Sequence, residues 1–416
     1  MYQIESSGQA VKARRLLRRG FRVSPTVILL GWTSCLTDIS AEMVSSILPV
    51  YLMVTLQFSP LQFGTLDGIQ QGAAAFVRLL SGFFSDRSRS HKRFAVLGYS
   101  LSALCKPVFL VAGSSWSGIA GLIFLDRIGK GVRTSPRDAL ISLATSRKRL
   151  ATAFGVHRAF DAAGAMLGPV IAFSLLAYAP RGFDAIFVTS TCFAVAGLAV
   201  VALFVRDRRS VGSAADAEPV SVNAVLGLLR FVVFRRLLAV GGMLSLATIS
   251  DAFVYLTLQQ RLHFSAGLFP LLFVITACFY VVLAIPMGRV ADRYGRVRTF
   301  VGGWVALLIV YTFLQHSSIG WGEALVCLAV LGVYYSATDG VLVAIASNEL
   351  PQQLRASGLA LLATVIGLAR LASSLLFGLF WTLWGVDVTV VAFQVMLAAA
   401  VFASIAMLDA LGRARG

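Results

Sequence analysis

The stretch from Ile186 to Val205 reads IFVTSTCFAVAGLAVVALFV and contains no charged residue. A second charge-free stretch runs from Val388 to Leu408. Each is close to the ~20 residues that a helix needs to cross the hydrocarbon of a bilayer. In lipid the backbone polar groups must be satisfied internally, which only helices and closed barrels achieve. Because these stretches are continuously apolar rather than alternating, they predict transmembrane helices.

The composition of the whole chain agrees with this interpretation. Of its 416 residues 58% are hydrophobic and only 13% are charged, whereas soluble domains carry roughly 25% charged residues. We therefore predict an all-α membrane protein with twelve spans, at 25–56, 62–84, 94–112, 118–143, 153–176, 184–205, 238–258, 266–288, 299–315, 320–347, 356–380 and 387–408.

The spans divide the chain into two six-helix bundles with polar segments around them. We expect a basic cytoplasmic flank at 1–24, the first bundle at 25–205 and the second at 238–408. Residues 206–237 lack a full apolar run at their start, which predicts a cytoplasmic linker followed by a helix on the membrane surface. Residues 409–416 form a short cytoplasmic tail.

Positive charge is distributed unevenly between the two sides of the predicted membrane domain. The net charge is +17, and 26 of the 36 Lys and Arg residues fall on the side of both termini. The opposite side holds Arg181 and Arg261, and the remaining basic residues lie within predicted spans. This is the positive-inside pattern, from which we expect both termini to be cytoplasmic. We also expect the protein to lie in the cytoplasmic (inner) membrane. The basic face is expected to meet lipid phosphates and not nucleic acid.

A repeat links the two halves. The segment Gly82-Phe-Phe-Ser-Asp86-Arg87 recurs as Gly288-Arg-Val-Ala-Asp292-Arg293, 206 positions later. Two bundles related by an axis along the membrane normal fit such a repeat. Because one chain holds both halves, we expect it to act as a monomer.

The second copy of this repeat continues as Tyr-Gly-Arg, and as a whole it resembles the signature of the major facilitator superfamily between spans 8 and 9. The first copy lies at the matching place between spans 2 and 3. This resemblance implies the major facilitator fold and transport by alternating access. It also implies that the repeat forms a latch between the halves, made of Gly82, Asp86, Arg87, Gly288, Asp292, Arg293, Gly295 and Arg296. The segments Thr37–Met43 and Arg133–Ile141 resemble one prokaryotic subgroup of the superfamily.

The fourth span is unusually charged. On a helix of about 100° per residue, Asp126, Lys130, Arg133 and Arg137 fall within about 60° of one another. Arg127, Thr134 and Asp138 form a neighbouring strip, and Arg127 also matches the fourth-span motif of the superfamily, which is linked to proton coupling. Such charges cannot face lipid, so they line a cavity, form ion pairs, or do both. Pro136 is expected to interrupt this helix.

An ion-pair network is the structural alternative for these charges. Its acidic members would be Asp38, Glu42, Asp67 and Asp161, together with Asp126 and Asp138. Its buried bases would be Arg78, Lys106, Arg127, Lys130, Arg133, Arg137 and Arg158. Asp38 and Glu42 are four residues apart and share a helix face, where a desolvated carboxylate is able to carry a proton.

Further charges lie in the fifth span and in the second half. In the fifth span His157, Arg158 and Asp161 lie close together along the helix. A proton relay through them is one interpretation, and pairing of Arg158 with Asp161 is the favoured one. In the second half, Asp251, Asp339 and Arg370 are predicted to line the central cavity between the halves.

The fifth span also contains Gly164-Ala-Met-Leu-Gly168-Pro169. This segment resembles the start of the superfamily's antiporter motif but lacks its final Gly-Gly, and Ala172 and Phe173 stand there instead. Small residues and Pro allow close helix packing, which we expect between spans 5 and 8.

The function predicted from these observations is proton-coupled transport of a small organic solute, with export of drugs or metabolites weakly favoured. The alternative is an organic-anion transporter that uses the basic residues of the fourth span. A membrane enzyme or a sensor is less favoured, because the sequence has no catalytic constellation, no loop large enough for a further domain and no metal-ligand spacing among its Cys and His residues. We expect no catalytic residue, metal or cofactor; the expected partners are the solute, protons and membrane lipids.

Overall fold

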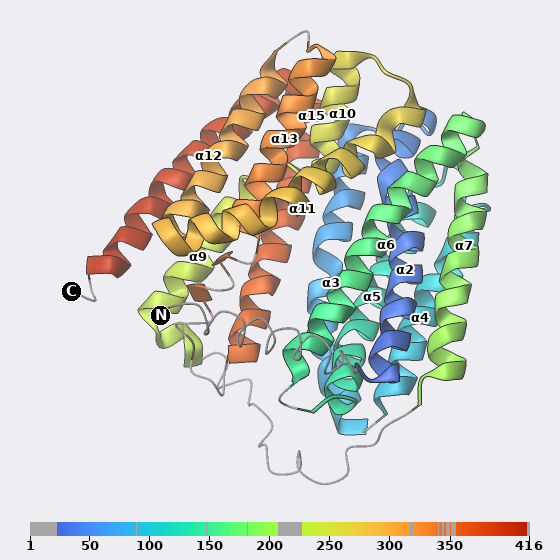
Figure 1. Ribbon diagram of the computed structural model, residues 1–416. Helices are drawn as coiled ribbons and strands as arrows, with labels where there is room; N and C mark the ends of the chain where they lie inside the picture. The colour runs from blue at the N-terminus through green and yellow to red at the C-terminus, as the bar shows by residue number, and fades with distance from the viewer. Residues whose placement is uncertain are drawn as a thin grey trace, which may run out of the picture.

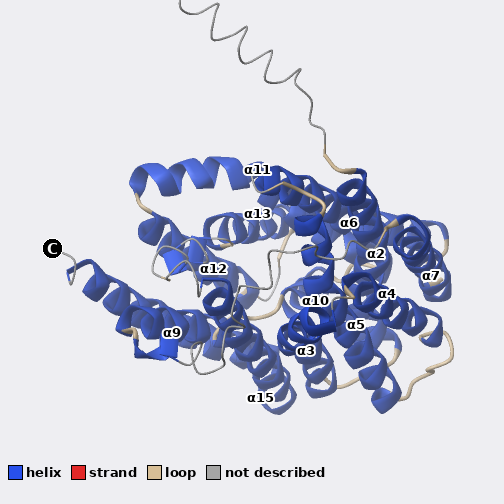
Figure 2. Ribbon diagram, turned by 90° about the horizontal axis from the view of Figure 1, so that it is seen from below, coloured by secondary structure: helices blue, strands red, loops and turns tan. Residues whose placement is uncertain are grey.

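The computed structural model describes residues 23–88, 90–146, 149–180, 182–206, 227–316, 319–339, 341–342, 345–346, 350 and 355–413. Within these ranges the regular structure is helical and contains no strand. The helices form two groups that lie side by side, with α2 to α7 in one and α9 to α15 in the other (Figures 1 and 2). The predicted all-α fold class is confirmed.

The first group follows the predicted first bundle. Its elements are α2 (Pro25–Val50) with η1 (Tyr51–Thr55), α3 (Pro60–Ser88), α4 (His91–Val108), α5 (Trp116–Leu143), α6 (Leu150–Tyr178) and α7 (Phe183–Ala199) with η3 (Val200–Phe204).

The second group begins beyond the undescribed linker residues 207–226. Its elements are η4 (Leu228–Arg230), α9 (Val232–Leu246), α10 (Asp251–Leu262), η5 (Ala266–Leu268), α11 (Phe269–Tyr294), α12 (Arg296–Gln315), α13 (Trp321–Thr338) and α15 (Arg355–Arg413). The helix α15 bends at Gly385, whose φ of 79° ends one helical segment and starts another.

Local sequence signals explain several of these boundaries. Pro25 stands in the first turn of α2, where its missing N–H costs nothing. The side chain of Ser115 caps α5 by accepting a hydrogen bond from the backbone N–H of Gly118 at 3.3 Å. Gly295, with φ of 101°, separates α11 from α12, and most residues with a side chain disfavour that conformation.

Helix covers part of every predicted span. Within the described residues, eight helical stretches are long and apolar enough to cross a membrane by length and composition. One of them, Gly358–Leu408, is 51 residues long and includes the bend at Gly385, so it is about twice the length that one crossing needs. The charged helices α3, α4 and α5 are not among the eight, and the total of twelve crossings stays a prediction.

The seventh predicted span is not continuous. It is divided into α9 and α10 by the non-helical residues 247–250. Side chains satisfy the backbone groups freed there: the N–H of Ile249 donates to the hydroxyl of Tyr311 at 2.6 Å, and the hydroxyl of Ser373 donates to the carbonyl of Thr248 at 2.5 Å. Irregular backbone at membrane depth is tolerated where protein covers it in this way. The expected interruption at Pro136 is wrong, because α5 runs through that residue.

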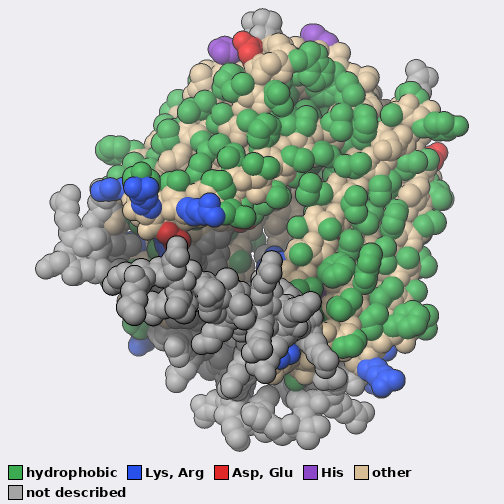
Figure 3. Space-filling view, in the orientation of Figure 1, with side chains coloured by type: hydrophobic (Ala, Val, Ile, Leu, Met, Phe, Trp, Pro, Cys, Tyr) green, Lys and Arg blue, Asp and Glu red, His purple; other side chains and the backbone are tan. Residues whose placement is uncertain are grey.

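Apolar side chains cover the outside of the molecule. Val111, Leu203 and Phe402 are at least 75% exposed, which would be costly in water but matches a surface that meets lipid tails. Figure 3 shows apolar side chains over most of the visible face, with Lys and Arg at mid-height on its left and in its lower part.

The closest packing between the two groups lies along α3 and α15. A Cβ built on Gly64 would stand 2.4 Å from the carbonyl oxygen of Ser374, and one built on Gly378 would stand 2.4 Å from that of Pro60. Gly68 and Gly72 continue this stripe toward Leu371. We name this contact, residues 60–72 of α3 against 367–382 of α15, the α3–α15 seam. Only glycine allows the two backbones to approach so closely.

Replacing a seam glycine should therefore destabilise the protein. We expect Gly378→Ala to cost about 1–3 kcal/mol through overpacking, lowering the melting temperature of the detergent-purified protein. The control Gly302→Ala changes a helical glycine whose Cβ would meet nothing within 4 Å, and it should be neutral or stabilising by up to about 1 kcal/mol. Equal melting temperatures for the two variants would contradict the tight seam.

Candidate functional site

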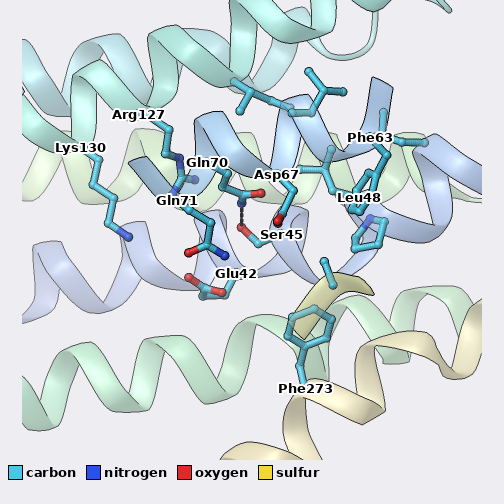
Figure 4. A pocket seen from close by; sticks show the side chains of 15 residues that line it. Glu42, Ser45, Leu48, Phe63, Asp67, Gln70, Gln71, Arg127, Lys130 and Phe273 are labelled. Carbon is cyan, nitrogen blue, oxygen red and sulfur yellow. Dashed lines mark hydrogen bonds between the residues drawn. The ribbon is translucent and has the colours of Figure 1, made fainter. Parts of the chain in front are cut away.

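A polar cavity of about 260 Å³ lies where α2, α3 and α5 face the second group of helices (Figure 4). Ala252 of α10 and Phe273 of α11 contribute to its wall from that second group. Its polar lining comes from the first group and consists of Glu42, Ser45, Asp67, Gln70, Gln71, Arg127 and Lys130. The cavity therefore collects three of the predicted fourth-span and first-span site residues, together with Asp67.

Two glutamines in this lining were not identified from the sequence. Gln70 donates from Nε2 to the hydroxyl of Ser45 at 2.9 Å, which connects α3 to α2. Gln71 and Glu42 point toward one another in Figure 4, with Lys130 beside them. The signal that could have found them is a pair of amides within an apolar run, because polar residues in a span are functional candidates by default.

Close packing against α6 holds the acidic face of α2 in place. A Cβ on Gly164 would stand 2.5 Å from the carbonyl oxygen of Cys35, and one on Gly168 would stand 2.8 Å from Cβ of Glu42. The helix α6 does contact α11, the eighth span, as expected. Gly164 and Gly168 themselves, however, face the turns of α2 that carry Asp38 and Glu42, and Pro169 is buried beside them.

The buried ion pairs of the fourth span centre on Asp126. Its Oδ1 lies 3.1 Å from Nζ of Lys106 and its Oδ2 lies 2.9 Å from Nη2 of Arg127. All three side chains are at most 10% exposed. Arg133 lies 4.7 Å above the ring of Tyr99, a cation–π contact. A network thus exists among three of its expected members, Asp126, Lys106 and Arg127, with Asp126 at its centre.

A second polar cluster joins α2, α5 and α6. Arg137 contacts Asp138 at 3.0 Å and donates to the hydroxyl of Ser34 at 2.9 Å. Asp161 lies 3.4 Å from Nδ1 of His157. The predicted pairing of Arg158 with Asp161 is wrong: on α6 His157 is four residues before Asp161 and shares its face, while Arg158 is exposed.

Several ionisable groups have no ion pair within the described part of the chain. Asp38, Glu42, Asp67 and Lys130 form no salt bridge within 4.0 Å there. Lys130 nevertheless lies close enough to Asp38 and Glu42 to interact electrostatically with their carboxylates. The expectation that Asp38, Glu42 and Asp67 pair directly with the fourth-span bases is therefore not met.

In the second group, tyrosines hold the carboxylates. The hydroxyl of Tyr335 donates to Asp251, and that of Tyr280 donates to Oδ2 of Asp339 at 3.0 Å. Arg370 is within electrostatic reach of both acids. Its Nε is buried and has no hydrogen-bond partner among the described residues. The structure thus brings the three predicted residues of this half together, through two tyrosines whose role as partners the sequence did not indicate.

The second copy of the predicted latch lies at the exposed turn between α11 and α12. Asp292 and Arg296 approach to 3.9 Å, with side chains 75% and 46% exposed. Arg293 lies 5.6 Å above the ring of Tyr294, and Gly295 provides the left-handed turn. The first copy consists of Gly82, Asp86 and Arg87, and the structure does not describe the surroundings of these three residues. The latch role stays a prediction.

Comparison with known proteins identifies the family. The family model described as Major Facilitator Superfamily matches residues 30–277 and 237–413. The chain is 31% identical to an uncharacterized MFS-type transporter of Methanocaldococcus jannaschii, covering 86% of this chain and 89% of that one. It is 26% identical to an uncharacterized protein of Mycobacterium tuberculosis, covering 91% of this chain and 92% of that one.

Solved structures of the same fold are also similar. The nucleoside transporter NupG superposes with a TM-score of 0.72 at 16% identity, over 92% of this chain and 99% of that one. A POT family transporter in complex with 5-aminolevulinic acid superposes with a TM-score of 0.75 at 13% identity, over 94% and 97% of the two chains.

The chain belongs to the major facilitator superfamily. It is a multi-pass membrane protein and a secondary transporter of a small molecule, and it is not an enzyme. This confirms the resemblance seen in the repeated signature.

The Asp126 network gives a stability prediction. Asp126→Asn leaves Lys106 and Arg127 as buried charges without a counter-charge, which should destabilise the protein by about 3–5 kcal/mol. The control Asp387→Asn removes the partner of Arg261 from a pair whose acidic side chain is 70% exposed, so it should cost no more than about 1 kcal/mol. Denaturant unfolding in micelles measures both, and an equally mild loss for Asp126→Asn would contradict the network.

Proposed function

We propose that this transporter exports a small organic solute, neutral or cationic, in exchange for protons. The observation that carries the proposal is the pairing of the ionisable side chains in the cavity lining. Glu42 and Asp67 line it without an ion pair among the described residues, whereas Arg127 is bound to Asp126. The uncommitted side chains are therefore mainly acidic, and acidic groups attract a cation or carry a proton.

The bases of α5 are engaged by their own neighbours. Arg137 is held by Asp138 and Ser34, and Arg133 lies over Tyr99. A base that is already satisfied gains less from an arriving anion than a free base does. These contacts favour a structural role for most of the predicted basic cluster. Asp38 and Glu42 are then the residues that bind the solute or the proton.

We further propose that the structure is open toward the cytoplasm, in the inner membrane, with both termini cytoplasmic. Support comes from the position of the α3–α15 seam. It uses the first turns of α3, at the end away from the basic α11–α12 turn, and the positive-inside pattern assigns that basic turn to the cytoplasm. Movement of the two bundles, 25–205 and 238–408, about the cavity would then alternate access. A single chain would suffice, and its basic cytoplasmic face would bind anionic lipids.

A second candidate function is transport of an organic anion. It is favoured by Lys130, which lines the cavity without a salt bridge within the described residues, and by the unsatisfied Nε of Arg370. An anion held between the two would contact both bundles. Binding of solutes of opposite charge separates this candidate from the first.

Ligand-induced thermal stabilisation should identify the solute class. A ligand that binds only the folded state raises its apparent stability by mass action. We expect organic cations to stabilise the purified protein, more strongly at mildly alkaline than at mildly acidic pH because fewer carboxylates are protonated there. Glu42→Gln should abolish this effect, and Arg137→Ala should keep it.

Stabilisation by anions, lost in Lys130→Gln and kept in Glu42→Gln, would instead establish the organic-anion function. A neutral panel is tested as well. If no cationic, neutral or anionic solute stabilises the protein, the proposed solute class is contradicted.

A further inference from the structure

Asp67 occupies an unusual position at the α3–α15 seam. It belongs to α3, in the first bundle, and its Oδ2 accepts a hydrogen bond of 2.6 Å from the hydroxyl of Ser374 in α15, in the second bundle. The residue is only 5% exposed. It also lines the polar cavity (Figure 4). Asp67 is therefore an ionisable residue that forms part of the contact between the halves and also lines the cavity where a solute would bind.

Its surroundings do not neutralise a negative charge. The polar side chains nearest to it are neutral: the Ser374 hydroxyl donates to it, and Ser250 and Gln71 lie close by. It has no salt bridge within 4.0 Å among the described residues. The bases of α5 that share its cavity face other acids, because Arg127 is paired with Asp126 and Lys130 is near Asp38 and Glu42.

The acids that face Asp67 make its charge still less favourable. Asp251 of α10 lies within electrostatic reach from the other half, and Glu42 of α2 lines the same cavity. Arg370, the base of α15 nearest to this region, is close to Asp251 and Asp339. A carboxylate that is desolvated and faces like charge is costly unless it binds a proton or regains water.

The packing around Asp67 excludes water on the side of the seam. Gly68 follows it directly, with its missing Cβ 2.9 Å from the carbonyl oxygen of Leu371, and Gly64 is three residues before it. The glycine stripe thus brings the α15 backbone against the turns of α3 that carry Asp67. Hydration of the carboxylate from that side requires the seam to separate.

We propose that Asp67 is the residue that couples protonation to the closing of the transporter: with a proton on Asp67 the α3–α15 seam closes, and without it the seam opens. This inference rests on the proposed proton coupling and assigns that coupling to Asp67. In the closed state the proton is able to leave through the cavity that Asp67 lines. Proton entry from the side of the seam would then drive the change toward the conformation with the closed seam.

Distance measurements between spin labels test this without knowledge of the solute. Labels at Ser117→Cys and His316→Cys, in a background without the five natural cysteines, report on the ends of the two bundles at the seam side; both positions are exposed. At mildly acidic pH we expect a single short distance. At mildly alkaline pH a longer population should appear in the otherwise unchanged protein.

Asp67→Asn keeps the shape of the side chain and an acceptor for Ser374 but does not titrate. It should lose the longer population and show the short distance at both pH values. The matched control Thr382→Ala removes another seam hydrogen bond, from the N–H of Leu61 to the Thr382 hydroxyl at 3.0 Å, without removing a titratable group. It should keep the response to pH.

A pH response that survives in Asp67→Asn would overturn the role of Asp67 and leave proton coupling standing with another carboxylate. A response lost equally in Thr382→Ala would assign the effect to seam packing and overturn the inference as well. No response in the unchanged protein, together with solute transport that ignores a pH gradient, would overturn the proposed proton coupling itself.

Discussion

A charged side chain inside a lipid-embedded bundle must be paired, hydrogen-bonded or neutralised by a proton, and the site of this transporter is organised by that constraint. Asp126 is neutralised by Lys106 and Arg127. Asp251 and Asp339 are held by tyrosine hydroxyls close to Arg370. Asp67 has a neutral hydroxyl partner and lies at the contact between the halves. An acid with a fixed counter-charge keeps the same charge throughout and contributes to the stability of the fold. An acid without a counter-charge is able to gain or lose a proton during transport.

Glycine packing places these groups. Gly164 and Gly168 bring α6 against the turns of α2 that carry Asp38 and Glu42. Gly98 and Gly129 bring α4 and α5 together next to Arg133 and Ser102. Gly64 and Gly378 do the same for the two halves. With no hydrophobic drive between helices in lipid, small residues that permit close approach provide much of the association energy, so glycine positions decide which polar side chains meet.

Much of the fold could be predicted from the sequence. Charge-free runs such as 186–205, together with the repeat of Gly82–Arg87 at Gly288–Arg293, are sufficient to indicate a two-part helical membrane protein. Helix periodicity also places Asp38 and Glu42 on one face. These signals depend on a single helix or on a single pair of segments, which is why sequence reasoning captures them.

The partners of each charge could not be predicted in the same way. A helical wheel places both His157 and Arg158 within about one turn of Asp161, but it does not give the rotation of α6 against its neighbours. That rotation leaves Arg158 exposed and His157 beside Asp161. The interruption at 247–250 carries neither Gly nor Pro, and it is stable because Tyr311 and Ser373 from distant helices satisfy its backbone. Such features depend on tertiary contacts, and the sequence of one segment does not contain them.

Proton movement is the most direct test of this account. The protein would be reconstituted into liposomes that contain a pH-sensitive dye, and a gradient of a stabilising solute would be imposed across the membrane. The account predicts that the internal pH changes as protons move against the solute. It also predicts that dissipating the resulting pH gradient speeds the solute, because that gradient opposes further exchange. A solute that crosses at the same rate with and without a pH gradient, and leaves the internal pH unchanged, would contradict it.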